Sequence, residues 1–367
     1  MTAETLSLRQ MNRATLARQM LLARHRLPAE RAIETLVAMQ AQFPRPPFVG
    51  LWSRLEGFER AELARLLEKR RVVRATFLRG TLHYVTAKDF VALRSLLQPG
   101  LDAGLKAILR DRWDRLDMNK LTALTRKILA KAPCTFEEIR DAFASSGGDV
   151  RAMGYAVRLT LPLVQVPVGG EAPWSFPPSC SFALADEWIG RPVPPPNDDR
   201  PDPLVLRYLA GYGPANVAAV QAWSGLPKLG DAVERLRKRL RVFRDEKGRE
   251  LFDLPDAPRP DADVPAPVRF VPDYDNLIAT RADERFVAKK DRPRVFLSAL
   301  RIAATVLVDG FVVATWKAER KKGAAILTIT PFAPLSARAG KDVIAEGEAL
   351  ARFLEPDART WDVRVSR

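Results

Sequence analysis

Two glutamines, spaced two residues apart, are the feature of this sequence best suited to chemistry. Gln40 and Gln42 stand in the run from Val37 to Pro47, which reads Val-Ala-Met-Gln-Ala-Gln-Phe-Pro-Arg-Pro-Pro. Residues two apart point to nearly opposite sides of a helix, but they share one face of an extended chain. An extended segment would therefore bring both amides to one target. An amide has a carbonyl acceptor and two N–H donors, which is enough to hold a water molecule and contact a ligand at the same time.

The residues around the pair predict where the helix ends. Ala29 to Met39 has helix formers and apolar residues at helical spacing. Pro44 disfavours helix at Phe43, and we expect Pro46 and Pro47 to prevent the helix from resuming. The helix should end near the two glutamines. The alternative is an ordinary polar helix end in a proline-rich turn, whose amides contact only water.

The charge of the chain indicates the kind of partner. Its 59 Lys and Arg residues against 44 Asp and Glu give a net charge of +15 over 367 residues. Such a balance favours a polyanion, with nucleic acid first and an anionic membrane surface second. The alternative is a basic protein without a polyanionic partner. The length allows two to four modules, each with its own core.

Cysteine, histidine and hydropathy exclude several classes of protein. Cys134 and Cys180 cannot make a disulfide framework or a zinc site by themselves, and His25 and His83 are too few for a metal cluster. We therefore predict chemistry without a metal or cofactor. No apolar run approaches the length that spans a bilayer, and the first residues lack a charged leader followed by an apolar core. These features predict a cytoplasmic, nucleoid-associated protein without membrane contact.

A pattern of helices followed by two strands occurs three times. In the first copy, helices at 10–22, 29–39 and 60–69 precede β-prone runs at 72–78 and 81–85, with Arg79-Gly80 as the turn. Residues 87–130 read as helical throughout. The second copy has a capping box from Thr135 to Glu138 that opens a helix to about 144, a turn at 145–148, and a helix at 151–161. Its strands are predicted at 163–168 and at Trp174 to Phe176, on either side of a turn at 169–170.

The third copy and the C-terminal part complete the predicted order. Helices at 203–210, 213–223 and 229–240 precede strands at 242–244 and 250–252, and proline-rich linkers occupy 191–197 and 255–267. Helices followed by a hairpin are typical of the winged helix. Strands at 268–271, 305–308, 311–316, 325–330 and 361–365, with a helix at 341–354, predict a small β-rich domain. We expect an α+β chain with boundaries at 1–130, 131–197, 198–260 and 261–367.

Five runs, in order along the chain, resemble the AlkZ-like winged-helix DNA glycosylases, which include azinomycin-resistance enzymes. They are Gln40 to Gln42, Leu78 to His83, Ala222 to Leu226, Pro272 to Leu277, and Thr305 to Trp316. The resemblance implies tandem winged-helix modules in a concave array with a β-rich C-terminal domain. It also implies a monofunctional enzyme that removes alkylated purines from duplex DNA, and some relatives unhook interstrand crosslinks.

The resemblance implies roles for particular residues. The catalytic signature of the family, Gln followed by a middle residue and Gln, maps onto Gln40, Ala41 and Gln42, although the middle residue is usually larger and more apolar. Residues 281–301 have no clear counterpart in the family. Duplex DNA with alkylated bases would be the partner of a monomeric protein. The candidate DNA-binding residues are Arg45, Arg79, His83, Arg235, Lys238 and Arg239.

Several alternatives remain open at the level of the sequence. Each basic residue can equally be solvated surface, and His83 can be a partly buried strand residue rather than a donor to phosphate or sugar. Asp273, Asp275 and Asn276 either orient polar groups near a lesion or shape a turn. A transcription regulator that uses the same modules for sequence readout is the rival function, and a damage-binding protein without catalysis is the third.

Overall fold

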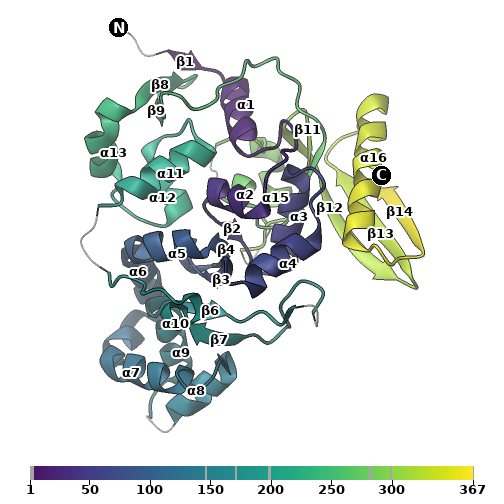
Figure 1. The fold of residues 1–367 in the computed structure, drawn as a ribbon. Helices are drawn as coiled ribbons and strands as arrows, with labels where there is room; N and C mark the ends of the chain where they lie inside the picture. Colours follow the sequence, from purple (N-terminus) through teal and green to yellow (C-terminus); the bar gives the residue numbers. More distant parts are fainter. Residues whose placement is uncertain are drawn as a thin grey trace.

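The structure, a computed structural model, describes residues 4–144, 147–169, 172–196, 200–280, 283–297 and 300–366. Within these residues, helices surround sheets of three, six and five strands, which confirms the predicted α+β class (Figure 1). Four segments discussed above lie partly outside the described residues: the predicted turns at 145–148 and 169–170, the linker at 191–197 and the stretch 281–301.

The helix before the glutamines ends three residues earlier than predicted. Helix α1 is Leu8–Arg18, and helix α2, Ala29–Leu36, buries its apolar face through Ala32, Ile33 and Leu36. Val37 then adopts a positive φ of 65°, which breaks the helix. Strand β2, Met39–Gln40, follows directly. The predicted extended chain at Gln40 is therefore confirmed.

The prediction that Pro46 and Pro47 prevent a new helix is wrong. Helix α3, Arg45–Arg54, begins one residue before these prolines, which occupy its first turn. Proline is tolerated there because the first helical N–H groups have no partner within the helix, and its fixed φ suits the start of a helix. The glutamines therefore lie in a short extended link between two helices.

A six-stranded antiparallel sheet joins the first two predicted modules. Its order is β2, β4, β3, β6, β7, β5, so the two predicted hairpins are parts of one sheet. The predicted strand at Trp174 to Phe176 is wrong, because the chain forms turns there and the strand lies at Ser181–Leu184. The strands are β2, β3 Val72–Thr76, β4 Leu82–Thr86, β5 Cys134–Thr135, β6 Leu163–Gln165 and β7 Ser181–Leu184.

The region predicted as helical from 87 to 130 is divided into five short helices. The third helix of the first module, α4, is Arg60–Glu68, close to its predicted bounds. The five pieces that follow β4 are α5 Ala87–Leu93, η2 Ser95–Leu97, α6 Gln98–Leu109, η3 Arg110–Arg115 and α7 Met118–Leu129. Helix α7 shares an apolar cluster with α8 Phe136–Ala144 and α9 Val150–Thr160, which lie beyond the predicted boundary at 130.

The third predicted group packs beside the first, and the N-terminus joins it. Strand β1, Thr5–Leu6, pairs in parallel with β8 and so completes a three-stranded sheet. A large apolar cluster with Tyr208, Tyr212 and Trp223 at its centre connects this group to the six-stranded sheet. Helix α10, Ala185–Ile189, follows β7 and precedes this group. The elements of the group are α11 Asp202–Tyr212, α12 Val217–Ser224, α13 Gly230–Leu236, η5 Arg237–Arg239, β8 Arg241–Asp245 and β9 Glu250–Asp253.

The C-terminal part forms the five-stranded sheet, with helix α16 against one of its faces (Figure 1). Phe270, Trp316 and Leu327 from the strands pack against Val343 and Leu350 of α16. Six of its elements were predicted with small shifts in their bounds: β10 Arg269–Val271, β11 Thr305–Val308, β12 Phe311–Lys321, β13 Ala324–Pro331, α16 Ala337–Leu354 and β14 Thr360–Val365. Three short helices among the described residues were not predicted: α14 Asn276–Ala279, η6 Lys289–Asp291 and α15 Arg292–Val295.

Two features are absent from the described residues. No helix among them is long and apolar enough to cross a bilayer. Nor does that part of the chain group three or more His, Cys, Asp or Glu side chains in a way that would hold a metal ion.

Candidate active site

The backbone of the Gln-Ala-Gln segment is held on both sides. Gln40 pairs with His83 of β4, and the Ala41 N–H donates to the Leu82 carbonyl at 2.7 Å. On the other side, the Arg74 guanidinium donates to the carbonyl oxygen of Ala41 at 2.9 and 3.0 Å and to that of Gln42 at 3.0 Å. Ala41 has no exposed surface and packs in an apolar cluster. The small middle residue is therefore part of the core, which fixes the direction of its two neighbours.

Arg79 fixes the orientation of the Gln40 side chain. It lies in η1, Leu78–Gly80, between β3 and β4, with a φ of 56°. Its Nη2 donates to Gln40 Oε1 at 2.9 Å and to Asn276 Oδ1 at 3.0 Å, while its Nη1 donates to the Trp223 carbonyl at 2.5 Å. Because Arg79 occupies Oε1, the two N–H groups of Gln40 are the part of its amide that can bind a ligand. Burial lowers the pKa of Arg79 to about 10, so the side chain stays charged at neutral pH.

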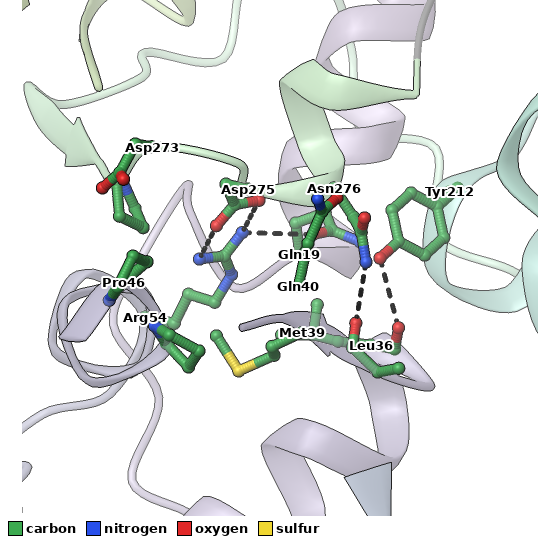
Figure 2. A pocket seen from close by; sticks show the side chains of 13 residues that line it. Gln19, Leu36, Met39, Gln40, Pro46, Arg54, Tyr212, Asp273, Asp275 and Asn276 are labelled. Carbon is green, nitrogen blue, oxygen red and sulfur yellow. Dashed lines mark hydrogen bonds and ion pairs between the residues drawn. The ribbon is translucent and has the colours of Figure 1, made fainter. Parts of the chain in front are cut away.

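A small hollow lies beside Gln40 (Figure 2). The space open to the centre of a water molecule is about 10 Å³, close to the minimum that one water requires. Two polar groups at its wall are already bound to each other, because both oxygens of Asp275 accept from Arg54 at 2.9 and 3.0 Å. The lining residues are Gln19, Leu36, Ala38, Met39, Gln40, Pro46, Pro47, Arg54, Tyr212, Pro272, Asp273, Asp275 and Asn276.

Hydrogen bonds between distant segments hold the wall of this small hollow in place. Asn276 donates to the Ala38 carbonyl at 3.0 Å, and the Tyr212 hydroxyl donates to the Leu36 carbonyl at 3.1 Å (Figure 2). Gln19 of the turn after α1 donates to the Gly211 carbonyl at 2.6 Å. Three other parts of the chain therefore meet around the segment that carries Gln40.

A larger hollow, of about 670 Å³, shares Asp273 with the small one. Phe43, next to Gln42, lines it with 56% of its surface exposed, and its ring lies 6.1 Å from that of Tyr274. Arg45, Arg301 and Lys317 add positive charge to its wall. Burial raises the pKa of the Asp273 carboxyl above its ordinary value, while the nearby Arg45 acts in the opposite direction. This second hollow therefore combines exposed aromatic surface with cations.

The two glutamines have different surroundings. Gln40 is 9% exposed and lines the small hollow. Gln42 is exposed and begins the turn that leads to Phe43 and α3. The segment thus presents one ordered, largely buried amide at the small hollow and one solvent-accessible amide two residues later.

The candidate DNA-binding residues differ in their surroundings. Arg45 is half-buried at the larger hollow, and Arg79 is engaged with Gln40 rather than directed at solvent. Lys238 and Arg239 are exposed, whereas Arg235 forms an ion pair with Asp202 at 2.5 Å.

For His83, a contact with a DNA phosphate does not fit the structure. It is fully buried, and its Nδ1 lies 3.0 Å from the Thr81 carbonyl, to which it donates. Burial and the charge of Arg79 lower its pKa to about 3, so this histidine is neutral. A buried, uncharged ring cannot bind a backbone phosphate at the surface, and the backbone of His83 pairs with Gln40 in the sheet.

The sequence indicated some of the surrounding residues but not others. Asp273, Asp275 and Asn276 stood out as a polar group without an assigned role, and all three line the small hollow. Gln19 and Arg54 were missed. Both are fully buried polar residues at the ends of helices, and only the polar character of an otherwise apolar helix face gives a signal for them in the sequence.

Comparisons with known proteins agree on the family. Residues 33–353 match the family described as DNA glycosylase AlkZ-like. The structure of the DNA glycosylase AlkZ from Streptomyces sahachiroi superimposes with a TM-score of 0.78 over 99% of this chain and 100% of that one, at 21% sequence identity. No curated protein sequence matches the chain. Because the family match extends over most of the 367 residues, the chain belongs to the AlkZ-like DNA glycosylase family.

Proposed function

We propose that this DNA glycosylase hydrolyses the N-glycosidic bond of purines alkylated at N7 in duplex DNA, as a monofunctional enzyme, and that lesions linking the two strands are among its substrates. The family match supports the glycosylase reaction. The proposed lesion follows from the neutral character of Gln40 and Gln42. Most glycosidases need a carboxylic acid to protonate the leaving group. A purine alkylated at N7 already carries a positive charge and leaves as a neutral base without such an acid.

The observation that carries this proposal is the fixed amide of Gln40. Arg79 holds its Oε1, so its N–H groups are the donors available to the sugar or the departing base. A hydrogen bond from a cation to the carbonyl oxygen also polarises the amide, and chains of hydrogen bonds strengthen one another in this way. Gln40 thus contacts the sugar or base from a preset position. The exposed Gln42 orients the attacking water, as a glutamine does in GTPases.

The rest of the fold supplies sequence-independent binding. We propose that the groups α2 to β4, α7 to β7 and α11 to β9 are tandem winged-helix modules in a concave array, and that the protein acts as a monomer. Lesions occur in any sequence, so contacts to phosphates matter more than contacts to base edges. Arg45 at the larger hollow and the exposed Lys238 and Arg239 are the candidates for those contacts.

The test uses a duplex with a single 7-methylguanine. We expect the purified protein to release free 7-methylguanine and leave a site that alkali cleaves, and we expect Gln40→Ala and Gln42→Ala each to lower the single-turnover rate by about 100-fold or more. Gln165→Ala is the matched control, because Gln165 lies on β6 of the same sheet and lines neither hollow. Unchanged cleavage by the Gln40 and Gln42 double variant would rule out this mechanism.

The same assay separates the rival functions. A regulator would protect one defined sequence and would not respond to alkylation. A damage-binding protein would bind the alkylated duplex and release no base. The small middle residue of the Gln-Ala-Gln segment would favour the latter, but Ala41 is packed in the core with its backbone bonded on both sides. Release of the base in a random sequence would exclude both rivals.

A further inference from the structure

The reaction proposed above lacks one component, which is a negative charge. As the N-glycosidic bond breaks, the sugar becomes an oxocarbenium-like cation, and glycosidases stabilise this state with a carboxylate. Gln40 and Gln42 are neutral and cannot do so. The carboxylates that line the two hollows are Asp273 and Asp275.

Asp275 is already neutralised. It is 8% exposed, and its two oxygens accept from the two terminal nitrogens of Arg54, which is itself 1% exposed. One of these oxygens also accepts from the Leu277 N–H at 2.9 Å. Removing one partner of such a buried pair leaves an uncompensated charge and costs several kcal/mol. Asp275 therefore holds α3 against the segment before α14 and is not available to a substrate.

Asp273 is in a different situation. Among the described residues it makes no direct ion pair, and Arg45 acts on it only from a distance. It borders both the small hollow, at the end away from Gln40 in Figure 2, and the large hollow beside Phe43. Its neighbour Tyr274 contacts the ring of Phe43, which is the residue after Gln42. Asp273 therefore lies close to the segments of both glutamines.

We infer that Asp273 is a further catalytic residue, the carboxylate that faces the reacting sugar. This inference rests on the proposed glycosylase function. The bond between C1′ and N9 breaks, its electron pair stays with the purine, and the base leaves neutral. The carboxylate stabilises the resulting sugar cation. The oxygen of the water that Gln42 orients then bonds to C1′, and one proton of this water passes to Asp273 and on to solvent.

The environment of Asp273 gives the reaction a defined pH dependence. The charged and titratable groups around it are Arg45 at the start of α3, Tyr274 with the nearby Arg301, and the Arg54 and Asp275 pair. Because the ionised form acts, activity is lost as pH falls through the pKa of Asp273, which burial places above the ordinary value of a carboxyl. The acid limb of the profile belongs to this residue.

The experiment compares Asp273→Asn and Asp273→Glu with the wild type on the 7-methylguanine duplex, between pH 4.5 and 8, with spontaneous depurination subtracted. We expect Asp273→Asn to lower the single-turnover rate on the order of 100-fold and to lose the acid limb. Its affinity for the lesion should be unchanged or higher, because a negative charge near DNA is removed. Asp273→Glu should restore part of the rate and the acid limb. Asp342→Asn on the exposed face of α16 is the matched control.

Each other outcome overturns the inference. A rate for Asp273→Asn within threefold of the wild type at every pH would show that the carboxylate is not used. A loss of affinity and of unfolding temperature that matches the loss of rate would show a structural role. If the wild-type chain releases no base at all, the proposed function fails and the inference fails with it, whereas release by the wild type with an unaffected Asp273→Asn variant removes the inference alone.

Discussion

The chemistry of this site depends on how single side chains are held, and Arg79 is the most informative of them. Its planar guanidinium bonds Gln40, Asn276 and the Trp223 carbonyl at once. Lysine keeps the charge but cannot reproduce this fork. We expect Arg79→Lys to lower the rate of base release by about 10- to 100-fold, because a displacement of about 1 Å in a positioned group has that effect. Single-turnover kinetics on the alkylated duplex measure it.

The control for this substitution is Arg94→Lys. Arg94 is also buried, with bonds to Gln98 and to the Leu159 carbonyl, but it does not contact the glutamine segment. Both variants should lose stability, and only Arg79→Lys should lose rate beyond what unfolding explains. Equal rates for the two variants would contradict the proposed role of Arg79.

His83 provides a prediction for the stability of the fold. Its pKa in the folded protein is about 3, whereas an ordinary histidine has a pKa of 6.5. The unfolded chain therefore takes up a proton below pH 6.5 that the folded chain does not, so stability falls as pH falls from about 6.5 towards 3. Between pH 7.5 and 5, His83 should contribute a loss of about 2 kcal/mol. Urea unfolding at several pH values should show a shallower loss for His83→Asn, and parallel curves would refute the assignment.

The sequence predicted the glutamine pair but not the residues that orient it. Gln40 and Gln42 stand out in the sequence because their spacing and the following prolines have local consequences. The bond from Arg79 to Gln40 joins residues 39 positions apart, and that to Asn276 joins residues 197 apart. Such partners depend on how β3, β4 and the segment before α14 are brought together. No local pattern contains this information, and for His83 the local pattern gave no sign of its complete burial.

At the scale of elements, regular hydrophobic spacing predicted most helices and strands, and the errors have common causes. Proline was taken as a helix breaker at residues 46 and 47, whereas at the first turn of α3 it starts a helix. Strand β7 was placed too early, because Trp174 and Phe176 have strand propensity but pack as part of a turn. Tertiary packing overrides propensity in such short segments.

Gly225 lets two elements meet at Arg79, which gives a prediction for the turn after α12. It has a φ of 80°, and an added Cβ would lie 3.2 Å from the Arg79 Cα. Gly57 has a φ of 68° with nothing within 4 Å of such a Cβ. Both Gly→Ala variants should lose on the order of 1 kcal/mol through backbone strain. Only Gly225→Ala should also lower the rate of base release, because it displaces Arg79. Thermal unfolding and single-turnover kinetics separate these effects, and equal activities would contradict the proposed link.

At the scale of the whole molecule, the net charge of +15 and the family assignment both point to DNA as the partner. An enzyme that finds lesions in any sequence has to bind undamaged DNA as well, and phosphate contacts supply that affinity. Part of the positive charge is not available for this purpose, because residues such as Arg54, Arg74 and Arg79 bind within the protein. The number of phosphates contacted should therefore be well below the number of basic residues.

The salt dependence of binding counts these contacts. The logarithm of the binding constant for duplex DNA falls linearly with the logarithm of salt concentration, with a slope of about −0.9 for each phosphate neutralised. Lys238 and Arg239 are exposed at η5, which follows α13 at the left of Figure 1. Arg338 and Lys341 are exposed on α16, at the right of the same view. Replacing the first pair with alanine should reduce the slope by about 2 units, equally for damaged and undamaged duplexes, while replacing the second pair should leave it unchanged. Fluorescence anisotropy between 50 and 200 mM salt measures this slope. If both double variants change it equally, Lys238 and Arg239 belong to a general positive surface, and the face of α13 and η5 is not the one that lies against DNA.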